Sequence, residues 1–182
     1  MGRNEKGLSK GNQFREYFLM IFVTVGTHEQ PFNRLVKAVD DLKLSGKITD
    51  SVFIQTGYST YVPKACEYKD FITMNQMSDY MQRARVIITH GGPSSFIMAL
   101  QLNKIPIVVP RMAKFNEHVN DHQVTFCNEL VERKFPISVV QQTRNLGSVI
   151  DGAFHRNTHE NIKLNNKKFV YYFQNIVAEL ID

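Results

Sequence analysis

The sequence predicts a doubly wound parallel α/β sheet of the Rossmann-like class, and three observations lead to that prediction. Short apolar runs such as residues 21–25 are typical of strands buried on both faces. Amphipathic helical patterns alternate with these runs along the chain. Residues 86–109 combine an apolar run, a glycine turn, a helical pattern and a second apolar run, which together indicate a βαβ unit with parallel strands.

Two prolines help to justify the helices. Pro31 and Pro93 both follow glycine-containing turns, and a proline can open a helix because its missing N–H would be unpaired there. Apolar residues then recur on one helical face in each case. The elements expected in chain order are a strand at 21–25, a helix from 31 to about 46, strands at 52–55 and 70–73, a helix opened by Asn75 or Ser78, the unit at 86–109, a helix at 119–134, a strand at 137–140 and a helix at 143–154.

We expect the chain to divide into three segments. Residues 1–19 are polar and aperiodic, which predicts a flexible N-terminal extension before a natural start at Met20. Residues 20–156 form the expected domain. Residues 157–182 begin polar and basic, and they end in a helical stripe that packs on the domain or docks on a partner or membrane face. The stripe consists of Phe169, Phe173, Ile176, Val177 and Leu180.

Composition and charge narrow the class of protein. The chain has 182 residues, of which 43% are hydrophobic and 21% charged, as is ordinary for a soluble globular protein. Its net charge of +5 fits either a solvated surface or an anionic partner, and no basic cluster with interleaved aromatics favours a nucleic acid. No stretch reaches the roughly 18 apolar residues of a membrane span. Cys66 and Cys127 lie in unlike contexts, which favours free thiols in a reducing compartment.

The glycine corner at Gly91 and Gly92 is the first candidate for ligand binding. A corner of this kind lets backbone amides approach a ligand, and the helix start at Pro93 supplies free N–H groups with partial positive charge. This arrangement suits a phosphate, although a tight βα turn alone explains it as well. His90 precedes the corner and either contacts the ligand or supports the loop.

The turn after the first strand is the second candidate, because open α/β sheets bind ligands at the carboxyl ends of their strands. His28 and Glu29 place an imidazole beside a carboxylate, and either can orient or deprotonate a hydroxyl. The alternative is that the turn caps the following helix, with Thr27 or Glu29 bonding backbone amides.

Residues 110–123 are polar and follow another expected strand end. His118 and His122 are four residues apart, a spacing that can bring two imidazoles onto one helical face. No third metal ligand is obvious, so hydrogen bonding of His122 and Gln123 to sugar hydroxyls or phosphate is favoured over a metal site.

Five motifs follow one another along the chain, namely GTHEQ at 26–30, DFI at 70–72, THGGPSS at 89–95, NKIPIVVP at 103–110 and EHVNDHQ at 117–123. In this order they resemble the C-terminal domain of glycosyltransferase family 28. More closely, they are similar to the small catalytic subunit of bacterial two-component capsular or exopolysaccharide glycosyltransferases of the β-1,4-galactosyltransferase type. The resemblance covers about residues 20–154.

The resemblance implies one half, the donor domain, of a GT-B enzyme. It places Phe71 and Ile72 beside uracil, and it places His122 and Gln123 at the donor sugar. The acidic ribose ligand of a peptidoglycan-synthesis relative falls at Met98 here, so Glu117 is the substitute that we expect. The nucleotide and its diphosphate are expected to be held by Thr27, His90, Gly91, Gly92, Ser94 and Ser95.

The implied activity is transfer of a sugar, galactose first of all, from a UDP-sugar to a lipid-linked acceptor in polysaccharide biosynthesis. The reaction inverts the anomeric centre and needs no metal or other cofactor, with His28 or Glu29 as the candidate base. The implied partner is a membrane-associated subunit with a complementary Rossmann half that binds the acceptor. It would hold this chain in the cytoplasm, at the inner face of the cell membrane.

Two alternatives come from other classes of protein. A non-catalytic nucleotide-binding or scaffolding subunit would share the βαβ unit and lack a positioned base. A free-standing nucleotide-sugar enzyme such as an epimerase is disfavoured, because the turn at 26–28 lacks the G-x-G-x-x-G fingerprint.

Overall fold

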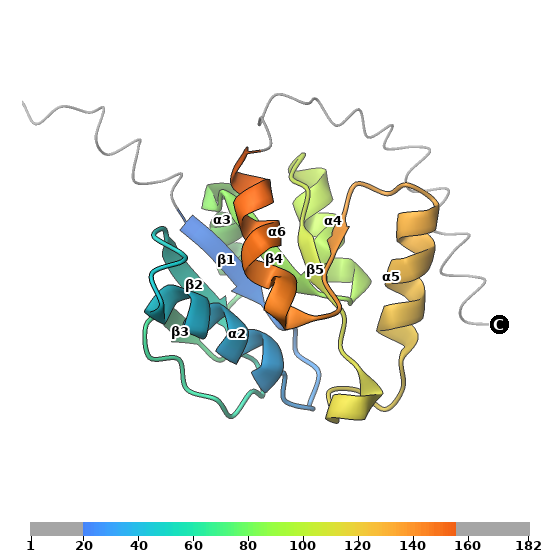
Figure 1. Ribbon diagram of the computed structural model, residues 1–182, viewed down its shortest axis with the longest axis horizontal. Coiled ribbons are helices and arrows are strands. Elements are labelled where there is room, and N and C mark those ends of the chain that lie inside the picture. The colour runs from blue at the N-terminus through green and yellow to red at the C-terminus, as the bar shows by residue number, and fades with distance from the viewer. Residues whose placement is uncertain (1–19, 156–182) are drawn as a thin grey trace, which may run out of the picture.

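A computed structural model describes residues 20–155, which form a six-stranded sheet with strand order β3-β2-β1-β4-β5-β6. Every neighbouring pair of strands is parallel, which confirms the doubly wound parallel α/β class (Figure 1). The strands are β1 Met20–Thr24, β2 Ser51–Gln55, β3 Glu67–Lys69, β4 Val86–His90, β5 Ile107–Val109 and β6 Ser138–Val139.

Helices cover both faces of this sheet. Helices α2 and α6 lie on one face, and α3, α4 and α5 lie on the other (Figure 1). The helices are α2 Asn33–Leu44, α3 Met74–Arg83, α4 Pro93–Gln101, α5 His122–Glu132 and α6 Leu146–His155, with 3₁₀ turns η1 Ala113–Phe115 and η2 Thr143–Asn145.

The apolar core follows from the alternation of side chains along the strands. In β1, Ile21 and Val23 face the helices α2 and α6, whereas Phe22 packs with α3 and α4. All five residues of β1 are buried, and so are all five of β4. Both strands can be buried throughout because helices cover each of their faces.

The strand order places the candidate loops together. The chain runs from β1 outward through β2 to β3, and it then crosses back to form β4 on the other side of β1. Connections that leave β1 and β4 therefore diverge to opposite sides, and a crevice forms at the carboxyl ends of these two strands. The turn at 26–30 and the corner at 91–92 both lie at this crevice.

The expected strand at 70–73 is wrong. The third strand is Glu67–Lys69, whose three residues are all exposed at the edge of the sheet, so no apolar run marks it. Thr73 instead caps α3, because its hydroxyl accepts the N–H of Gln76 and the Gln76 side chain accepts the N–H of Thr73. Asn75 and Ser78 therefore lie inside α3 and do not open it.

Asp40 is a buried carboxylate that the sequence pattern did not single out. It lies on α2 and accepts the hydroxyl of Tyr61 at 2.8 Å and the backbone N–H groups of Lys64, Ala65 and Cys66 at 2.9, 2.8 and 3.2 Å. Burial acts to raise the pKa of Asp40, but these hydrogen bonds favour its charged form more strongly and leave the pKa below the usual value. One side chain thus fastens the long loop after β2 to α2.

Replacing Asp40 by asparagine is expected to lower the free energy of unfolding by about 1.5–3 kcal/mol, the range for hydrogen bonds to a charged group. Because the folded pKa of Asp40 lies below its unfolded value, its contribution is present above the unfolded pKa and is lost as pH falls through the folded pKa. Urea denaturation at neutral and acid pH tests this. Asp41→Asn, at an exposed i,i+4 pair with Lys37, is the control, and equal losses in the two variants would contradict the prediction.

Candidate active site

The candidate site lies at the edge of the sheet where the parallel strands end. Three segments meet there, namely the turn at 26–30 after β1, the corner at 91–92 after β4 and the loop at 110–121 after β5. Direct contacts between side chains and backbone join all three segments, and they are described in turn below.

The ring of His90 lies between two glycines. A Cβ atom added to Gly26 would lie 2.6 Å from His90 Cε1, and one added to Gly92 would lie 2.2 Å from His90 Nε2. Gly26 also has a φ of +78°, a conformation that side chains rarely adopt. Both glycines are therefore needed for the imidazole to occupy its place. This explains why the turn at 26–30 and the corner at 91–92 each carry a glycine beside His90.

His90 is held as a neutral imidazole. Burial lowers its pKa to about 3, and the charges of Arg111, His28 and His118 act in the same direction. Its Nδ1 atom has no hydrogen-bond partner among the described residues. Of the two roles expected for His90, support of the loop is the one that its packing between glycines explains.

The start of α4 presents unsatisfied backbone donors. Gly92 occupies the N-cap and Pro93 the first helical position, and no side chain within residues 20–155 caps the amides of the first turn. Ser94 is exposed and Ser95 is buried in that turn, which contains no acidic residue. An α-helix start of this kind can bind an anion through its N–H groups and its partial positive charge.

Gln123 joins α5 to the ends of two strands. Its Oε1 atom accepts the N–H of Gly91 and the N–H of Arg111, both at 3.0 Å. The N–H of Gly91 is therefore engaged within the protein, whereas the expectation placed it around a diphosphate. The Nε2 amide group of Gln123 is the end of the side chain that can donate to a ligand. It lies in the same helical turn as the exposed His122, the first residue of α5.

Glu117 is a structural residue in the loop after β5. Arg34 on α2 donates to both of its carboxylate oxygens at 2.8 Å, and the N–H of Met112 donates to Oε2 at 3.1 Å. Arg34 also donates to the carbonyls of Pro110 and Gln141. Glu117 is only 2% exposed, so its carboxylate is not open to a ribose, which corrects the role expected for it.

Arg111 is the buried cation of the site, and the sequence reasoning missed its role. Its guanidinium donates to the carbonyls of Gln30, Val25 and Glu117 at 2.7, 2.9 and 3.0 Å, and it stacks over Phe32. Burial lowers its pKa to about 10, while Glu117 acts in the opposite direction. The one sign of this role in the sequence is the position of Arg111, which directly follows an apolar strand and Pro110.

Two imidazoles stack at the opening of the site. The rings of His28 and His118 have centroids 4.5 Å apart and an interplanar angle of 16°. His28 Nε2 also bonds to Gln30 Oε1 at 2.9 Å. Burial lowers the pKa of His118, with His28 adding to the effect. The turn after β1 and the loop after β5 are thus in contact through side chains that can take part in proton transfer.

The helix-cap interpretation of the first turn is wrong. The N-cap of α2 is Phe32, and no side chain in the described part of the chain caps the amides of the first turn of this helix. Thr27 and Glu29 are both exposed. The side chains of Thr27 and Glu29 therefore do not cap α2.

Phe71 and Ile72 lie apart from the other candidates. They follow β3, and β2 and β1 separate that strand from β4 in the sheet. Phe71 is 44% exposed and meets Tyr58 edge-on, with centroids 5.1 Å apart, whereas Ile72 packs toward the core formed with α3. They share the carboxyl edge of the sheet with the glycine corner but do not belong to the cluster around His90.

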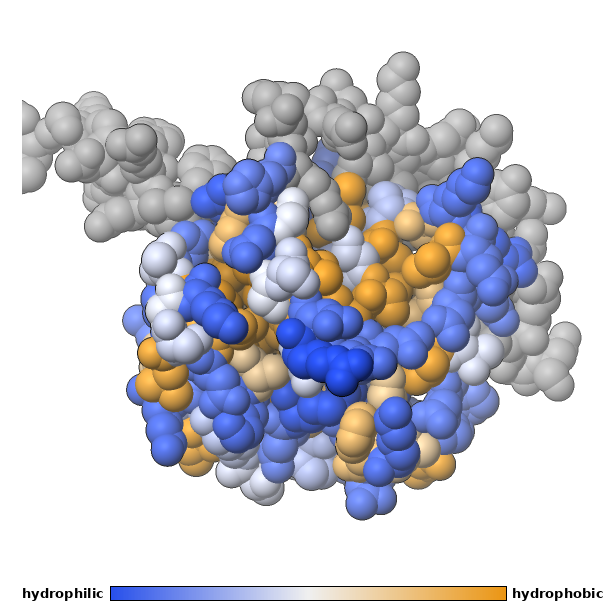
Figure 2. Space-filling view, in the orientation of Figure 1, coloured by the Kyte–Doolittle hydropathy of each residue, from blue (hydrophilic) through white to orange (hydrophobic). Residues whose placement is uncertain are grey.

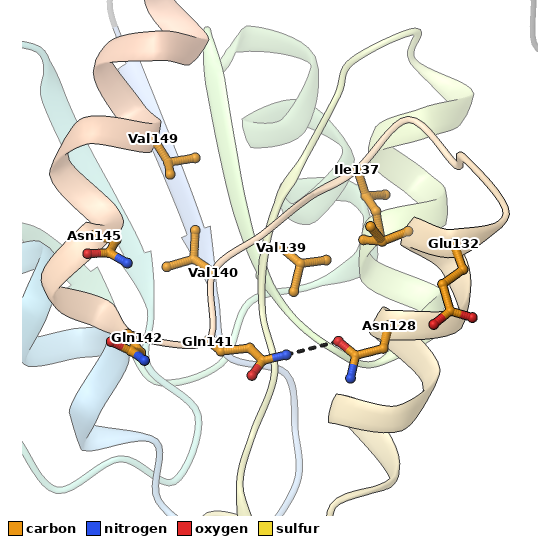
Figure 3. A pocket seen from close by; sticks show the side chains of 10 residues that line it. Asn128, Glu132, Ile137, Val139, Val140, Gln141, Gln142, Asn145 and Val149 are labelled. Atoms are coloured by element: carbon orange, nitrogen blue, oxygen red, sulfur yellow. Dashed lines mark hydrogen bonds between the residues drawn. The ribbon is translucent and has the colours of Figure 1, made fainter.

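The groove beside β6 is a cavity of a different kind. It measures about 620 Å³ and lies between α5 and α6, where Figure 2 shows hydrophobic side chains in a hollow. Val139, Val140 and Val149 line it, and Gln141 Nε2 donates to Asn128 Oδ1 at 2.9 Å beside it (Figure 3). None of its lining residues belongs to the glycine corner or to the stacked histidines.

Two properties of the described chain bear on the class of site. Within residues 20–155, no group of three or more His, Cys, Asp or Glu side chains is placed to hold a metal ion. In the same range, no helix has the length and apolar character needed to cross a membrane. Cys66 and Cys127 are both buried and unpaired.

A six-stranded parallel sheet flanked by helices, with a glycine corner at its switch point, defines a Rossmann-like domain of the kind found as the C-terminal domain of GT-B glycosyltransferases. The model of the glycosyltransferase family 28 C-terminal domain matches residues 20–179. The chain therefore belongs to this family of glycosyltransferase domains.

Solved structures of glycosyltransferases are similar to this chain, and the first of the two named here shares its fold. The spinosyn forosaminyltransferase SpnP is similar with a TM-score of 0.57 and 12% sequence identity, over 87% of this chain and 43% of that chain. The calicheamicin glycosyltransferase CalG4 matches with a TM-score of 0.46 and 15% identity, over 80% of this chain and 36% of that one. The chain thus spans less than half the length of these glycosyltransferases. A comparison with curated proteins found no match.

Proposed function

We propose that this domain binds the UDP part of a UDP-sugar and takes part in transfer of the sugar to a lipid-linked acceptor. The observation that carries the proposal is the uncapped start of α4 behind Gly92, at the switch point of the sheet in a glycosyltransferase-family domain. A diphosphate is the ligand whose charge and hydrogen-bond acceptors suit such a helix start.

The proposed reaction is an inverting displacement. An acceptor hydroxyl attacks the anomeric carbon while the bond from that carbon to the UDP oxygen breaks, and UDP leaves with the electron pair. Negative charge develops on the leaving diphosphate, and the amides of the first turn of α4 can stabilise it. This assignment gives a metal ion no necessary part in the reaction.

His28 is the first candidate to accept the proton of the attacking hydroxyl, and the exposed Glu29 is the second. His122 and the side-chain amide N–H₂ group of Gln123 are proposed to bind the sugar, with galactose as the first candidate. Ser94 and Ser95, in the first turn of α4, are proposed to lie around the diphosphate with Gly92.

The acceptor is proposed to bind to a second Rossmann half on a membrane-associated partner, which would hold this chain at the inner face of the membrane. Apolar side chains exposed in the loops at the carboxyl edge of the sheet support this proposal, because such groups often mark an interface. They are Tyr58, Phe71, Phe115 and Val119.

The proposal predicts that the chain alone binds UDP more tightly than UMP, because the second phosphate adds acceptors for the start of α4. Binding should persist in excess chelator. Isothermal titration calorimetry with each nucleotide, with and without chelator, measures both effects. Equal affinities for UMP and UDP, or loss of UDP binding on chelation, would contradict the assignment. Rapid transfer to a lipid-linked acceptor by this chain alone would contradict the need for a partner.

A further inference from the structure

The stacked pair of His28 and His118 joins two loops that are distant in the sequence. His28 belongs to the turn after β1 and His118 to the loop after β5, and their rings lie nearly parallel with centroids 4.5 Å apart. Offset stacking of flat rings restricts how each ring can tilt. His118 therefore limits the orientations open to His28.

The side-chain amide of Gln30 faces one nitrogen of the His28 ring. Gln30 Oε1 lies 2.9 Å from His28 Nε2, and because an amide oxygen only accepts, this contact is a hydrogen bond in the tautomer that carries its proton on Nε2. In a neutral imidazole the other nitrogen, Nδ1, then keeps its lone pair. Gln30 is itself held, since its backbone carbonyl accepts from the buried Arg111 at 2.7 Å.

The position of His118 is secured from its own side. Its neighbour Glu117 is fixed by two hydrogen bonds from Arg34, and the N–H of Asn120 donates to His118 Nδ1 at 3.5 Å. Burial and the nearby His28 lower the pKa of His118, which favours a neutral ring in the stack. A loop held by these hydrogen bonds thus presents a flat ring to His28.

We propose that His118 is a positioning residue for His28, with Gln30 fixing the tautomer of His28. This inference rests on the proposed function, in which the acceptor hydroxyl attacks the anomeric carbon. As the new carbon–oxygen bond forms and UDP leaves with the electron pair, the hydroxyl proton passes to Nδ1 of His28. His118 touches neither the reacting atoms nor the proton, and it acts by holding the His28 ring.

The test uses the active complex of this chain with its acceptor-binding partner and measures kcat and KM for the UDP-sugar. His28→Ala should lower kcat by on the order of 10²–10⁴. His118→Ala should lower kcat roughly 10- to 100-fold with little change in KM for the donor, because misplacing a reacting group slows the reaction without weakening the ground state. His118→Phe keeps a flat ring and should restore most of the lost kcat.

The control is His155→Ala at the exposed end of α6, which should leave both constants unchanged. Equal kcat in His118→Ala and the wild-type complex would overturn the inference, and so would equal losses in the Ala and Phe variants. If UDP binds but His28→Ala keeps full turnover, the inference also fails. If the wild-type chain binds no UDP, the proposed function itself fails.

A second measurement needs only this chain. Nitrogen-15 spectra of the histidine rings, assigned with the His28→Ala variant, report which nitrogen bears hydrogen. We expect His28 as the Nε2–H tautomer in the wild type and as a mixture in Gln30→Met, where the acceptor is gone. A wild-type His28 protonated mainly on Nδ1 would overturn the proposal whatever the activity.

Discussion

Gly92→Ala is expected to abolish measurable UDP binding. The added Cβ would lie 2.2 Å from Nε2 of His90, closer than any real contact allows. The ring also has little room on its other side, where the backbone of Gly26 lies so near that a Cβ atom there would be 2.6 Å from His90 Cε1. Either the corner or the ring must therefore be displaced, and the backbone amides at the start of α4 move away from their place.

Calorimetric titration with UDP and thermal unfolding measure the two consequences of this substitution. Gly152→Ala is the matched control, since nothing lies within 4 Å of its added Cβ and it sits in α6. This control should bind UDP normally and gain about 0.5–1 kcal/mol of stability from helix propensity. The double variant Gly92→Ala with His90→Ala should regain UDP binding, because the clash is then removed. Normal UDP binding by Gly92→Ala alone would contradict the geometry.

Glu117→Leu is expected to lower the free energy of unfolding by about 3–5 kcal/mol, the cost of breaking a buried ion pair on one side. The Arg34 side chain is 14% exposed and would lose its only carboxylate partner in the described structure. The N–H of Met112 would lose its acceptor as well. A larger loss than for Asp40→Asn follows, because here a cation is left without its counter-ion.

Urea denaturation at neutral pH measures this effect. Asp79→Asn is the control, because Asp79 forms an exposed i,i+4 pair with Arg83 in which the side chains are 58% and 41% exposed. That pair should contribute less than about 1 kcal/mol. If both variants lost the same small amount, Glu117 would have no special part in holding the loop after β5 against α2.

The fold was predictable because its signals are local. Pro93 after a glycine corner and the apolar run at 86–88 define their elements within a few residues, and the βαβ unit follows from them. The third strand was predicted at the wrong place because it has no such local signal. Its residues 67–69 are exposed and take their extended conformation from pairing with β2.

The site was predictable in position but not in its internal contacts. The motifs correctly place His28, His90 and the glycine corner at one edge of the sheet. Which charges pair is a property of the folded chain, because Arg34 and Glu117 lie 83 residues apart in the sequence. A carboxylate near a ligand site and one locked in a salt bridge look identical in sequence, and for this reason Glu117 was misassigned.

The order of strands has a consequence for how the chain reaches its folded state. The central strand β1 is formed by the first described residues, yet one of its edges pairs with β4, where Ile21 lies opposite Val86. Until β4 is synthesised, the apolar segment Met20–Thr24 keeps an open edge that another chain can pair with. Closing so long a loop also slows folding, because its entropy is lost before the contacts form. We therefore expect nascent chains that end before β4 to aggregate, and chaperones to bind them at β1.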